Sequence, residues 1–556
     1  MNKNIIKTED VIIPNNIPGI GYNYFNKMKE HASQNKIAQI VEKTDEKVSF
    51  ESLLKRCIRT SMFLQKNGIK KDDVIALFGP KHVHSVVSFI SSHFIGAIPT
   101  CVAYDYPEND IKSILKSIEP KIIFTDSKCL TVLKEYLRDI GLSVKFIVFG
   151  DCEEGFNFFD IIKPQAGEEN FEPVKIDNLK NTAIIYYSSG TTGPPKPICI
   201  SHYAMLANVI SSFPKEPDME VLNHYQKQFS NGVRFLDHLP LYWISGELST
   251  WIQSGSTRIL IEKFEALKFW DIVDKYKVNV TFIAANFLIE LSECPKSEHL
   301  NVDSLCIIIV GGFHAKEECL ASVRKMMHPL SAVIPVFGQT EFNGGTMFYD
   351  VRDKTQLKYL NEKPNSVGMV VKGLSVKVVD LDTNEILGPN KSGEILMKGE
   401  TCFNGYYKMD SKDCFDEDGY FRTGDIGYYD EDKCFYIIDR VKGIFKYSIF
   451  PKIASSNIEK IIMKHPAVKQ AAVFGYPHPI DQNHVTAVVV LEENAQATSE
   501  EIINFVDSQV EDYKRLRGGL KIVKELPLTL TGKIKTGDLK ALVDGNLCSP
   551  SLSPTD

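Results

Sequence analysis

Short β-branched runs alternate with longer amphipathic segments through roughly the first 350 residues of this 556-residue chain. The runs are Val74–Phe78, Lys121–Thr125, Lys145–Phe149, Ala183–Ser188, Val280–Ile283, Cys306–Val310 and Ala332–Phe337. Strands that alternate with helices in this way predict parallel sheets covered by helices on both faces. Because ligands bind at the carboxyl ends of such strands, we expect the segments that follow them to share one cleft.

The pattern changes toward the carboxyl end of the chain. Short strands and turns from about residue 366 to 429, such as Gly393–Gly399, predict a β-rich subdomain. After Asp439-Arg440, the sequence predicts a compact α+β unit. Its expected elements are an amphipathic helix near Ser456–Lys464, strands at Val468–Gly475 and Val485–Leu491, and a helix from Ser499. A chain of this length exceeds one hydrophobic core, so we expect an α/β protein of two domains.

Composition excludes several classes of partner and site. A net charge of −7 gives no electrostatic reason to expect nucleic acid or an anionic membrane as partner. The 12 cysteines are scattered without a Cys-x-x-Cys pair or a His/Cys ligand spacing. This usage predicts reduced thiols and argues against a zinc site or a disulfide framework.

The termini and the longest apolar tract predict a cytoplasmic protein. The first residues contain no apolar signal core, and the polar C-terminus has no Ser-Lys-Leu peroxisomal tripeptide. Histidines and serines interrupt the tract Val83–Val102, so it reads as a buried helix and strand. We therefore expect no transmembrane segment.

The loop that begins at Ser188 has the residue types of a phosphate-binding site. The predicted strand before Ser188 leads into small hydroxyl and glycine residues that end at a lysine. These residues are Ser188, Ser189, Gly190, Thr191, Thr192, Gly193 and Lys196. Clustered backbone N–H groups, hydroxyls and one cation suit a polyphosphate. Two prolines separate Gly193 from Lys196, so this is not a Walker A loop, and an ordinary surface turn is the alternative.

Further motifs add a carboxylate, a diol acceptor and two cations. They are Gly311-Gly312-Phe313, Phe337-Gly338-Gln339-Thr340-Glu341, Thr423-Gly424-Asp425, Asp439-Arg440 and the terminal loop around Lys533. Each motif alone is common in solvated turns or at helix starts. Their significance therefore depends on their order along one chain.

In this order the motifs resemble the adenylate-forming superfamily, which includes acyl-CoA synthetases, 4-coumarate–CoA ligases and beetle luciferases. The resemblance extends over nearly the entire chain. It implies ATP-dependent activation of a small carboxylic acid through an acyl-adenylate, with ATP, Mg²⁺ and CoA as cofactors. It also implies a large AMP-binding domain over residues 1–438, a hinge at 439–440 and a small mobile domain over 441–556.

The resemblance assigns roles to individual residues. The loop from Ser188 to Lys196 would close over the β- and γ-phosphates, and Glu341 would hold Mg²⁺. Lys533 would bridge the substrate carboxylate and the α-phosphate. The remaining contacts implied are Thr340 with the α-phosphate; Phe337 stacked on adenine beside Gly311 and Gly312; Asp425 at the ribose hydroxyls; Arg440 at the ribose or phosphate; Gly338, Gln339 and Lys446 as further cofactor-binding residues; and Tyr242, Trp243 and Phe313 in the acyl pocket.

Three positions depart from the family pattern. Pro197 follows Lys196 where the family has glycine, which is tolerable at the start of a strand. Trp243 stands where relatives carry histidine, either as a pocket wall or as a core residue. After Lys446 the family has glycine beside the pantetheine channel, and Ser448 and Ile449 would crowd that channel.

Three functions fit these residues. The leading hypothesis is an acyl-CoA synthetase that acts on a medium- or long-chain fatty acid or an aryl acid. The second is a luciferase-like monooxygenase that adenylates a luciferin. The third is a reduced-activity homologue that binds nucleotide or acyl groups.

Overall fold

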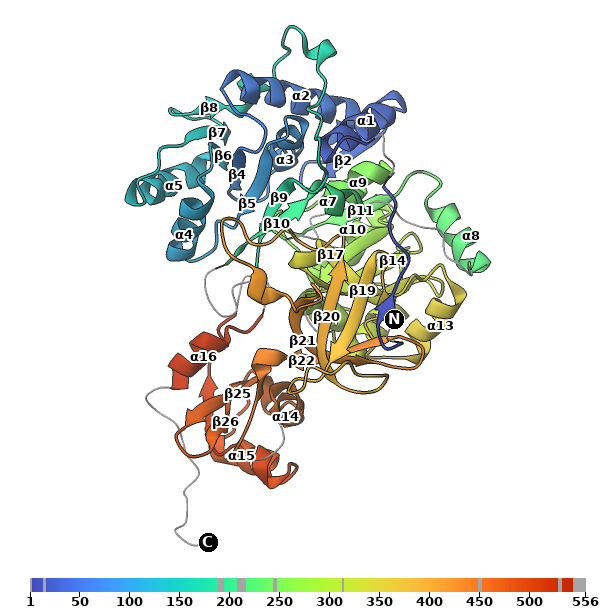
Figure 1. Cartoon of the computed structure of the whole chain (residues 1–556). Coiled ribbons are helices and arrows are strands. Elements are labelled where there is room, and N and C mark those ends of the chain that lie inside the picture. Colours follow the sequence, from blue (N-terminus) through green and yellow to red (C-terminus); the bar gives the residue numbers. More distant parts are fainter. Residues whose placement is uncertain are drawn as a thin grey trace.

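The computed structural model describes residues 3–13, 17–188, 195–207, 217–243, 248–312, 315–448, 453–528 and 533–543. Figure 1 shows an α/β molecule whose C-terminal elements lie below the larger N-terminal part. The α/β class, the parallel-rich sheets and the small α+β C-terminal unit are confirmed. None of the described helices is long and apolar enough to cross a membrane.

The first sheet has seven strands in the order β10-β9-β5-β4-β6-β7-β8. Their bounds are β4 Val74–Phe78, β5 Ile98–Val102, β6 Ile122–Asp126, β7 Lys145–Phe149, β8 Phe156–Asn157, β9 Thr182–Tyr187 and β10 Pro197–Ser201. All neighbours are parallel except β9 and β10, which form an antiparallel edge. Sheet and helices bury apolar side chains on both faces, as the alternating pattern predicts.

Strand β4 shows how the two faces are covered. Val74, Ala76 and Phe78 pack into a core with helices α4 (Glu108–Ile118) and α5 (Ser127–Asp139). Ile75 and Leu77 point into the opposite core, with three helices: α1 (Ile20–Ser33), α2 (Phe50–Lys66) and α3 (Ser85–Phe94). Successive side chains of a strand alternate between faces, so a continuous apolar run serves both.

The second sheet has the order β15-β14-β13-β11-β12-β2-β3 and joins distant parts of the chain. Its bounds are β2 Ile37–Val41, β3 Lys47–Ser49, β11 Arg234–Asp237, β12 Thr257–Leu260, β13 Val280–Ala284, β14 Ile307–Gly311 and β15 Ala332–Pro335. Thr257 Oγ1 donates to the carbonyl of Ile37 (2.9 Å), 220 residues away in sequence. Three helices cover this sheet: α10 (Ala266–Tyr276), α11 (Ala285–Glu293) and α12 (Glu317–Lys325).

One predicted strand is wrong in its extent. Residues Ala332–Phe337 divide at Val336 into β15 and the separate strand β16 (Phe337–Gln339). β16 belongs to an antiparallel sheet with β17 (Gly344–Phe348) and β18 (Met369–Val370). Gly338 therefore lies inside an antiparallel strand and does not follow the end of a parallel one.

The predicted β-rich subdomain is a five-stranded antiparallel sheet. Its strands are β1 (Ile6–Lys7), β19 (Leu374–Val379), β20 (Gly393–Gly399), β21 (Phe421–Tyr429) and β22 (Phe435–Arg440). Thr8 Oγ1 donates to the carbonyl of Leu374 (2.9 Å), so the N-terminal segment forms one edge.

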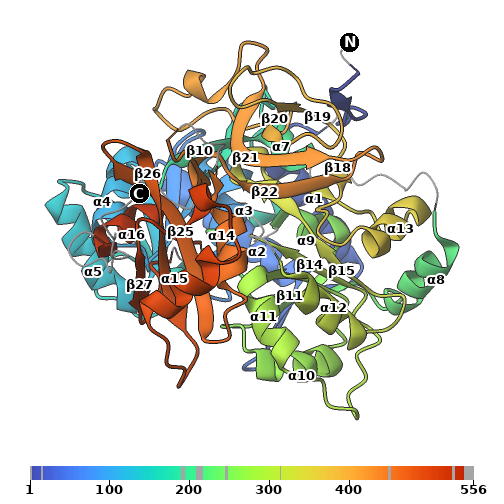
Figure 2. The ribbon, with the colours of Figure 1, turned by 90° about the horizontal axis from the view of Figure 1, so that it is seen from below.

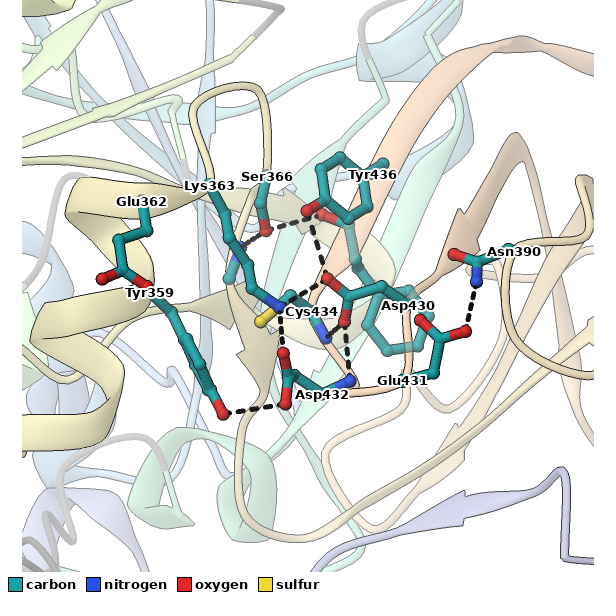
Figure 3. A network of polar contacts seen from close by, with 12 residues as sticks. Tyr359, Glu362, Lys363, Ser366, Asn390, Asp430, Glu431, Asp432, Cys434 and Tyr436 are labelled. Atoms are coloured by element: carbon teal, nitrogen blue, oxygen red, sulfur yellow. Dashed lines mark hydrogen bonds and ion pairs between the residues drawn. The ribbon is translucent and has the colours of Figure 1, made fainter.

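A polar network ties this sheet to helix α13 (Lys354–Glu362) (Figure 3). Lys363 Nζ lies 2.6 Å from carboxylate oxygens of Asp430 and Asp432, in the turn between β21 and β22. Tyr359 donates its hydroxyl proton to Asp432 (2.9 Å). The network fixes the turn that precedes Arg440.

The C-terminal unit packs α14 (Ser455–Ile462) and α15 (Ser499–Asp507) against a three-stranded sheet. The strands are β25 (Val468–His478), β26 (Gln482–Leu491) and β27 (Leu520–Val523), and α16 (Thr536–Val543) follows near the end of the chain. Two short strands, β23 (Ile444–Phe445) and β24 (Ile453–Ala454), precede α14. A capping box between Thr498 and Glu501 begins α15. Seen from below, these elements lie beside β21 and β22 (Figure 2).

Candidate active site

Strand pairing brings Asp425 and Arg440 together. They are direct partners in the antiparallel pair of β21 and β22. Arg440 Nη1 lies 2.8 Å from Asp425 Oδ1, and Gln339 Nε2 donates to Asp425 Oδ2. Asp425 is 3% exposed, and Gln339 Oε1 is buried without a hydrogen-bond partner among the described residues. A buried, rigid carboxylate beside an unsatisfied amide oxygen can accept hydrogen bonds from a polar ligand.

Glu341 is held by residues around Tyr406. It lies in the 3-10 turn Thr340–Phe342, directly after β16. Its carbonyl accepts from Phe403 N (2.7 Å), and its Oε1 accepts from the Tyr406 hydroxyl (3.4 Å). The ammonium of Lys196 lies 5.0 Å from the centre of the Tyr406 ring. Tyr406 therefore connects two residues that the sequence analysis singled out separately.

The base of the phosphate-loop candidate is closed by two hydrogen bonds. Ser188 N donates to the Lys196 carbonyl, and Lys196 N donates to Ser188 Oγ, both at 3.0 Å. Pro197 begins β10 and its carbonyl accepts from Tyr407 N (2.8 Å), so its missing N–H is tolerated at this edge. The loop residues predicted between them, Ser189, Gly190, Thr191, Thr192 and Gly193, lie outside the described residues.

Lys533 lies at this cluster although it belongs to the C-terminal end of the chain. Burial, and then the charge of Arg440, lower the pKa of Lys533 below its usual value. The carboxylates of Asp425 and Glu341 oppose this decrease. Burial in turn raises the pKa values of Glu341 and Asp425, while Arg440 and Lys533 oppose that rise. Two cations and two carboxylates thus face one another at the junction of the two parts.

Two glycines face the predicted acyl-pocket residues. A Cβ at Gly312, whose φ is +95°, would lie 3.0 Å from the indole of Trp243. A Cβ at Gly311 would lie 2.8 Å from Val336 and 3.0 Å from Phe282. The Trp243 ring packs edge-on against Phe282 at 5.9 Å. The half-buried tryptophan therefore stands beside the glycine pair, while Phe313 lies outside the described residues.

Tyr242 and Lys446 contact other parts of the chain. Burial raises the pKa of Asp105, and the Tyr242 hydroxyl opposes that rise. The Tyr242 ring lies 6.4 Å from the Tyr106 ring. Lys446 is exposed, and its carbonyl accepts from Asn483 Nδ2 (3.1 Å) within the C-terminal unit. The structure thus does not place Lys446 with the group around Lys533.

The segment after Lys446 contains a strained residue. Ser448 has a φ of +50°, in the left-handed region that favours glycine. Its N–H donates to the Asp481 carbonyl (2.7 Å), which fixes this conformation. The predicted crowding of the channel by Ser448 stays a prediction, and Ile449 lies outside the described residues.

Asp439 connects the two parts. Its Oδ1 accepts from Arg440 N (2.7 Å) and its Oδ2 from Ser456 N (3.1 Å) in α14. A Cβ at Gly443 would lie 2.5 Å from Asp439 Oδ1, so glycine is required for this approach. The hinge at 439–440 stays a prediction. A rotation about it would change these contacts.

A half-buried carboxylate near Asp439 predicts a pH effect on stability. Burial, and then the charge of Asp439, raise the pKa of Glu459 to about 7, against about 4.3 in an unfolded chain. The folded protein holds a proton that the unfolded chain has released, so stability falls as pH rises from about 5 to 8. Glu459→Gln should remove this loss. At pH 8 its free energy of unfolding should exceed that of the wild type by about 1 kcal/mol.

Calorimetric unfolding at several pH values checks this expectation. The amide oxygen of the introduced glutamine can still accept from Val473 N, as Glu459 Oε1 does at 2.8 Å. Glu500→Gln, at an exposed position on α15, is the control and should leave the pH dependence of the unfolding free energy unchanged. An equal stability difference at pH 5 and pH 8 would contradict the assignment.

Sequence reasoning missed Tyr406 and Phe403. Both rings pack together at 5.1 Å, and Tyr406 also pairs with Ile198 of β10 through an isolated bridge. The only signal was an aromatic pair after the turn Asn404-Gly405. Such a signal does not distinguish a core aromatic from one that supports a site.

Two family profiles and several known proteins match this chain. The profile described as "AMP-binding enzyme" matches residues 28–407, and "AMP-binding enzyme C-terminal domain" matches residues 457–533. Luciferin 4-monooxygenase of Nipponoluciola cruciata is 30% identical over 519 residues, 91% of each chain. Probable 4-coumarate–CoA ligase 2 of Dictyostelium discoideum is 26% identical over 495 residues, 86% of this chain and 87% of that one.

Solved structures share the fold. The luciferase-like enzyme of the nonluminescent mealworm Zophobas morio superposes with a TM-score of 0.70 at 28% identity, over 78% of this chain and 99% of that one. ATP-bound MatB of Rhodopseudomonas palustris superposes with a TM-score of 0.78 at 23% identity, over 94% and 99%. With profiles covering most of its length, the chain belongs to the AMP-binding, adenylate-forming enzyme family.

Proposed function

We propose that the protein activates a carboxylic acid with ATP and then transfers the acyl group to CoA. In the first step a carboxylate oxygen bonds to the α-phosphorus while the bond to pyrophosphate breaks. In the second step the thiol sulfur bonds to the acyl carbon and AMP leaves. The observation that carries the proposal is the pairing of the buried Asp425 carboxylate with Arg440, and the charge of Lys533 favours the ionised form of that carboxylate.

The residues at the junction suit the first step. Substrate carboxylate and phosphate are both anions, so cations that are already in place lower the barrier. Lys533 and Arg440 supply that charge. Tyr406 orients Glu341, whose carboxylate oxygen is the ligand type that Mg²⁺ prefers, and when bound the ion would neutralise phosphate charge. Asp425, fixed by Arg440 and Gln339, suits the paired hydroxyls of a ribose.

The pocket residues favour an apolar or aromatic acid. Trp243 and Phe282 offer aromatic surface beside Gly312, and Tyr242 lies near Tyr106. An indole carries no group that exchanges protons near neutral pH. We therefore propose a medium- or long-chain fatty acid or an aryl acid as substrate.

Pyrophosphate exchange with a panel of fatty and aryl acids, followed by addition of CoA, tests the proposal. Exchange and a thioester with the same acid would support the ligase. Exchange without thioester, together with light or O₂ uptake on luciferin, would support a luciferase-like monooxygenase, the second candidate. That candidate is favoured by the similarity to luciferin 4-monooxygenases. Absence of exchange with every acid would leave a nucleotide- or acyl-binding homologue.

Relaxing the backbone at Ser448 should increase thioester yield. Ser448→Gly removes the Cβ that disfavours a φ of +50°, a cost of roughly 1–2 kcal/mol, and opens the predicted channel. We expect a several-fold higher thioester yield with pyrophosphate exchange unchanged. Asn494→Gly is a matched control, because Asn494 has a φ of +66° in an exposed turn. Equal yields from both variants would mean that Ser448 does not limit the second step.

A further inference from the structure

The hairpin between β25 and β26 brings two histidines and an aspartate together. One ligand atom from each of His478, Asp481 and His484 lies within 4.8 Å of the others. His484 Nε2 lies 2.8 Å and His478 Nδ1 3.3 Å from the same oxygen, Asp481 Oδ2. The two imidazole rings stack with centroids 3.8 Å apart. Both nitrogens therefore converge on one carboxylate oxygen.

We propose that His478, Asp481 and His484 form a site for a divalent transition-metal ion, with Zn²⁺ as the best match. Two imidazoles and a carboxylate are ligands that Zn²⁺ accepts at bond lengths of about 2.0–2.2 Å. Tetrahedral ligands at that radius lie about 3.3 Å apart, close to the nitrogen–oxygen distances here. Three protein ligands leave a fourth position for water on this partly exposed hairpin.

Hydrogen bonds already orient the three side chains. Asp481 N donates to His478 Nδ1 (3.2 Å), and a bound ion would replace this hydrogen bond at the same lone pair. His484 Nε2 and Asp481 Oδ2 share a hydrogen bond that a metal would replace. The competing interpretation is a hydrogen-bonded turn that needs no ion, and the two make different predictions for metal binding.

The site would stabilise the segment that contains Ser448. Ser448 N donates to the Asp481 carbonyl (2.7 Å), and Gln482 Nε2 donates to the Ser448 carbonyl (3.3 Å). The Tyr447 ring lies 5.8 Å from the His484 ring. A bound ion would therefore restrict motion of Lys446–Ser448 whether or not the proposed acyl transfer is correct.

The sequence analysis argued against zinc because it looked for paired cysteines and for histidines with cysteine-type spacing. Here each ligand lies three positions after the previous one, and a hairpin turn, not a helix, brings them together. Gln482 adopts a φ of +64° in that turn. A carboxylate between two histidines in a turn has no distinctive sequence signature.

Zn²⁺ titration of metal-stripped full-length protein tests the proposal. Calorimetry should find that the wild type binds one equivalent of Zn²⁺. Asp481→Asn and His484→Asn should bind Zn²⁺ at least about tenfold more weakly, because losing a ligand costs more affinity than losing an outer-shell partner. Co²⁺ should give a visible d–d band in the wild type that both variants lack. His299→Asn, at an exposed histidine of the N-terminal part, should behave as the wild type.

Amide hydrogen exchange supplies a second readout. Zn²⁺ should slow exchange at Tyr447 and Ser448 in the wild type and leave Asp481→Asn unchanged. Circular dichroism of the metal-free variants shows whether they fold. Equal Zn²⁺ stoichiometry and affinity in folded wild type, Asp481→Asn and His484→Asn would overturn the site.

Discussion

Lys533→Ala should reduce pyrophosphate exchange by at least about a hundredfold while ATP still binds, because removing a charge-stabilising donor costs roughly 3–4 kcal/mol of transition-state energy. Lys533 is the cation that reaches the carboxylates of Asp425 and Glu341 from the C-terminal unit. Steady-state exchange with a saturating acid, together with nucleotide binding by calorimetry, separates catalysis from binding.

Lys535→Ala is the matched control for this prediction. Lys535 lies two residues away and its N–H donates to the Pro527 carbonyl, a contact that alanine keeps. It should retain nearly full exchange. Full exchange in Lys533→Ala would refute the role of this lysine, and loss of ATP binding alone would assign it to the nucleotide.

Asp425→Asn should have the second-largest effect. The side chain is 3% exposed and accepts from both Arg440 and Gln339. Removing its charge leaves Glu341 as the one carboxylate of the cluster to compensate Arg440 and Lys533, and weakens acceptance of ribose hydroxyls. Breaking a buried charge pair costs roughly 2–5 kcal/mol, so we expect ATP affinity to fall at least about thirtyfold.

Calorimetric ATP titration measures this loss directly. Glu431→Gln, an exposed carboxylate in the turn between β21 and β22, should bind ATP as the wild type does. The introduced asparagine keeps the shape of the aspartate side chain, so we expect the variant to fold. A thermal unfolding scan shows whether it does, and so separates lost affinity from lost folding. Unchanged ATP affinity in a folded Asp425→Asn protein would remove Asp425 from the nucleotide site.

Local sequence signals predicted the strands well because buried parallel strands are short apolar runs. They also singled out Asp425 and Arg440, which the structure shows to be cross-strand partners and whose roles stay predictions. They could not predict contacts that depend on distant chain segments. The link from Glu341 to Lys196 through Tyr406 arises from such contacts, whereas the separation of β16 from β15 and the His478–His484 stack arise from turns that have no distinctive sequence signal.

The long-range pairing of the first strands has a consequence for biosynthesis. Thr8 bonds Leu374 at a separation of 366 residues, and Ile37 bonds Thr257 at 220. A ribosome adding roughly 5–20 residues per second needs about 20–70 s to supply the partner of Thr8. The earliest segment of the nascent polypeptide must therefore wait, unpaired and open to chaperones or proteases, until most of the message has been translated.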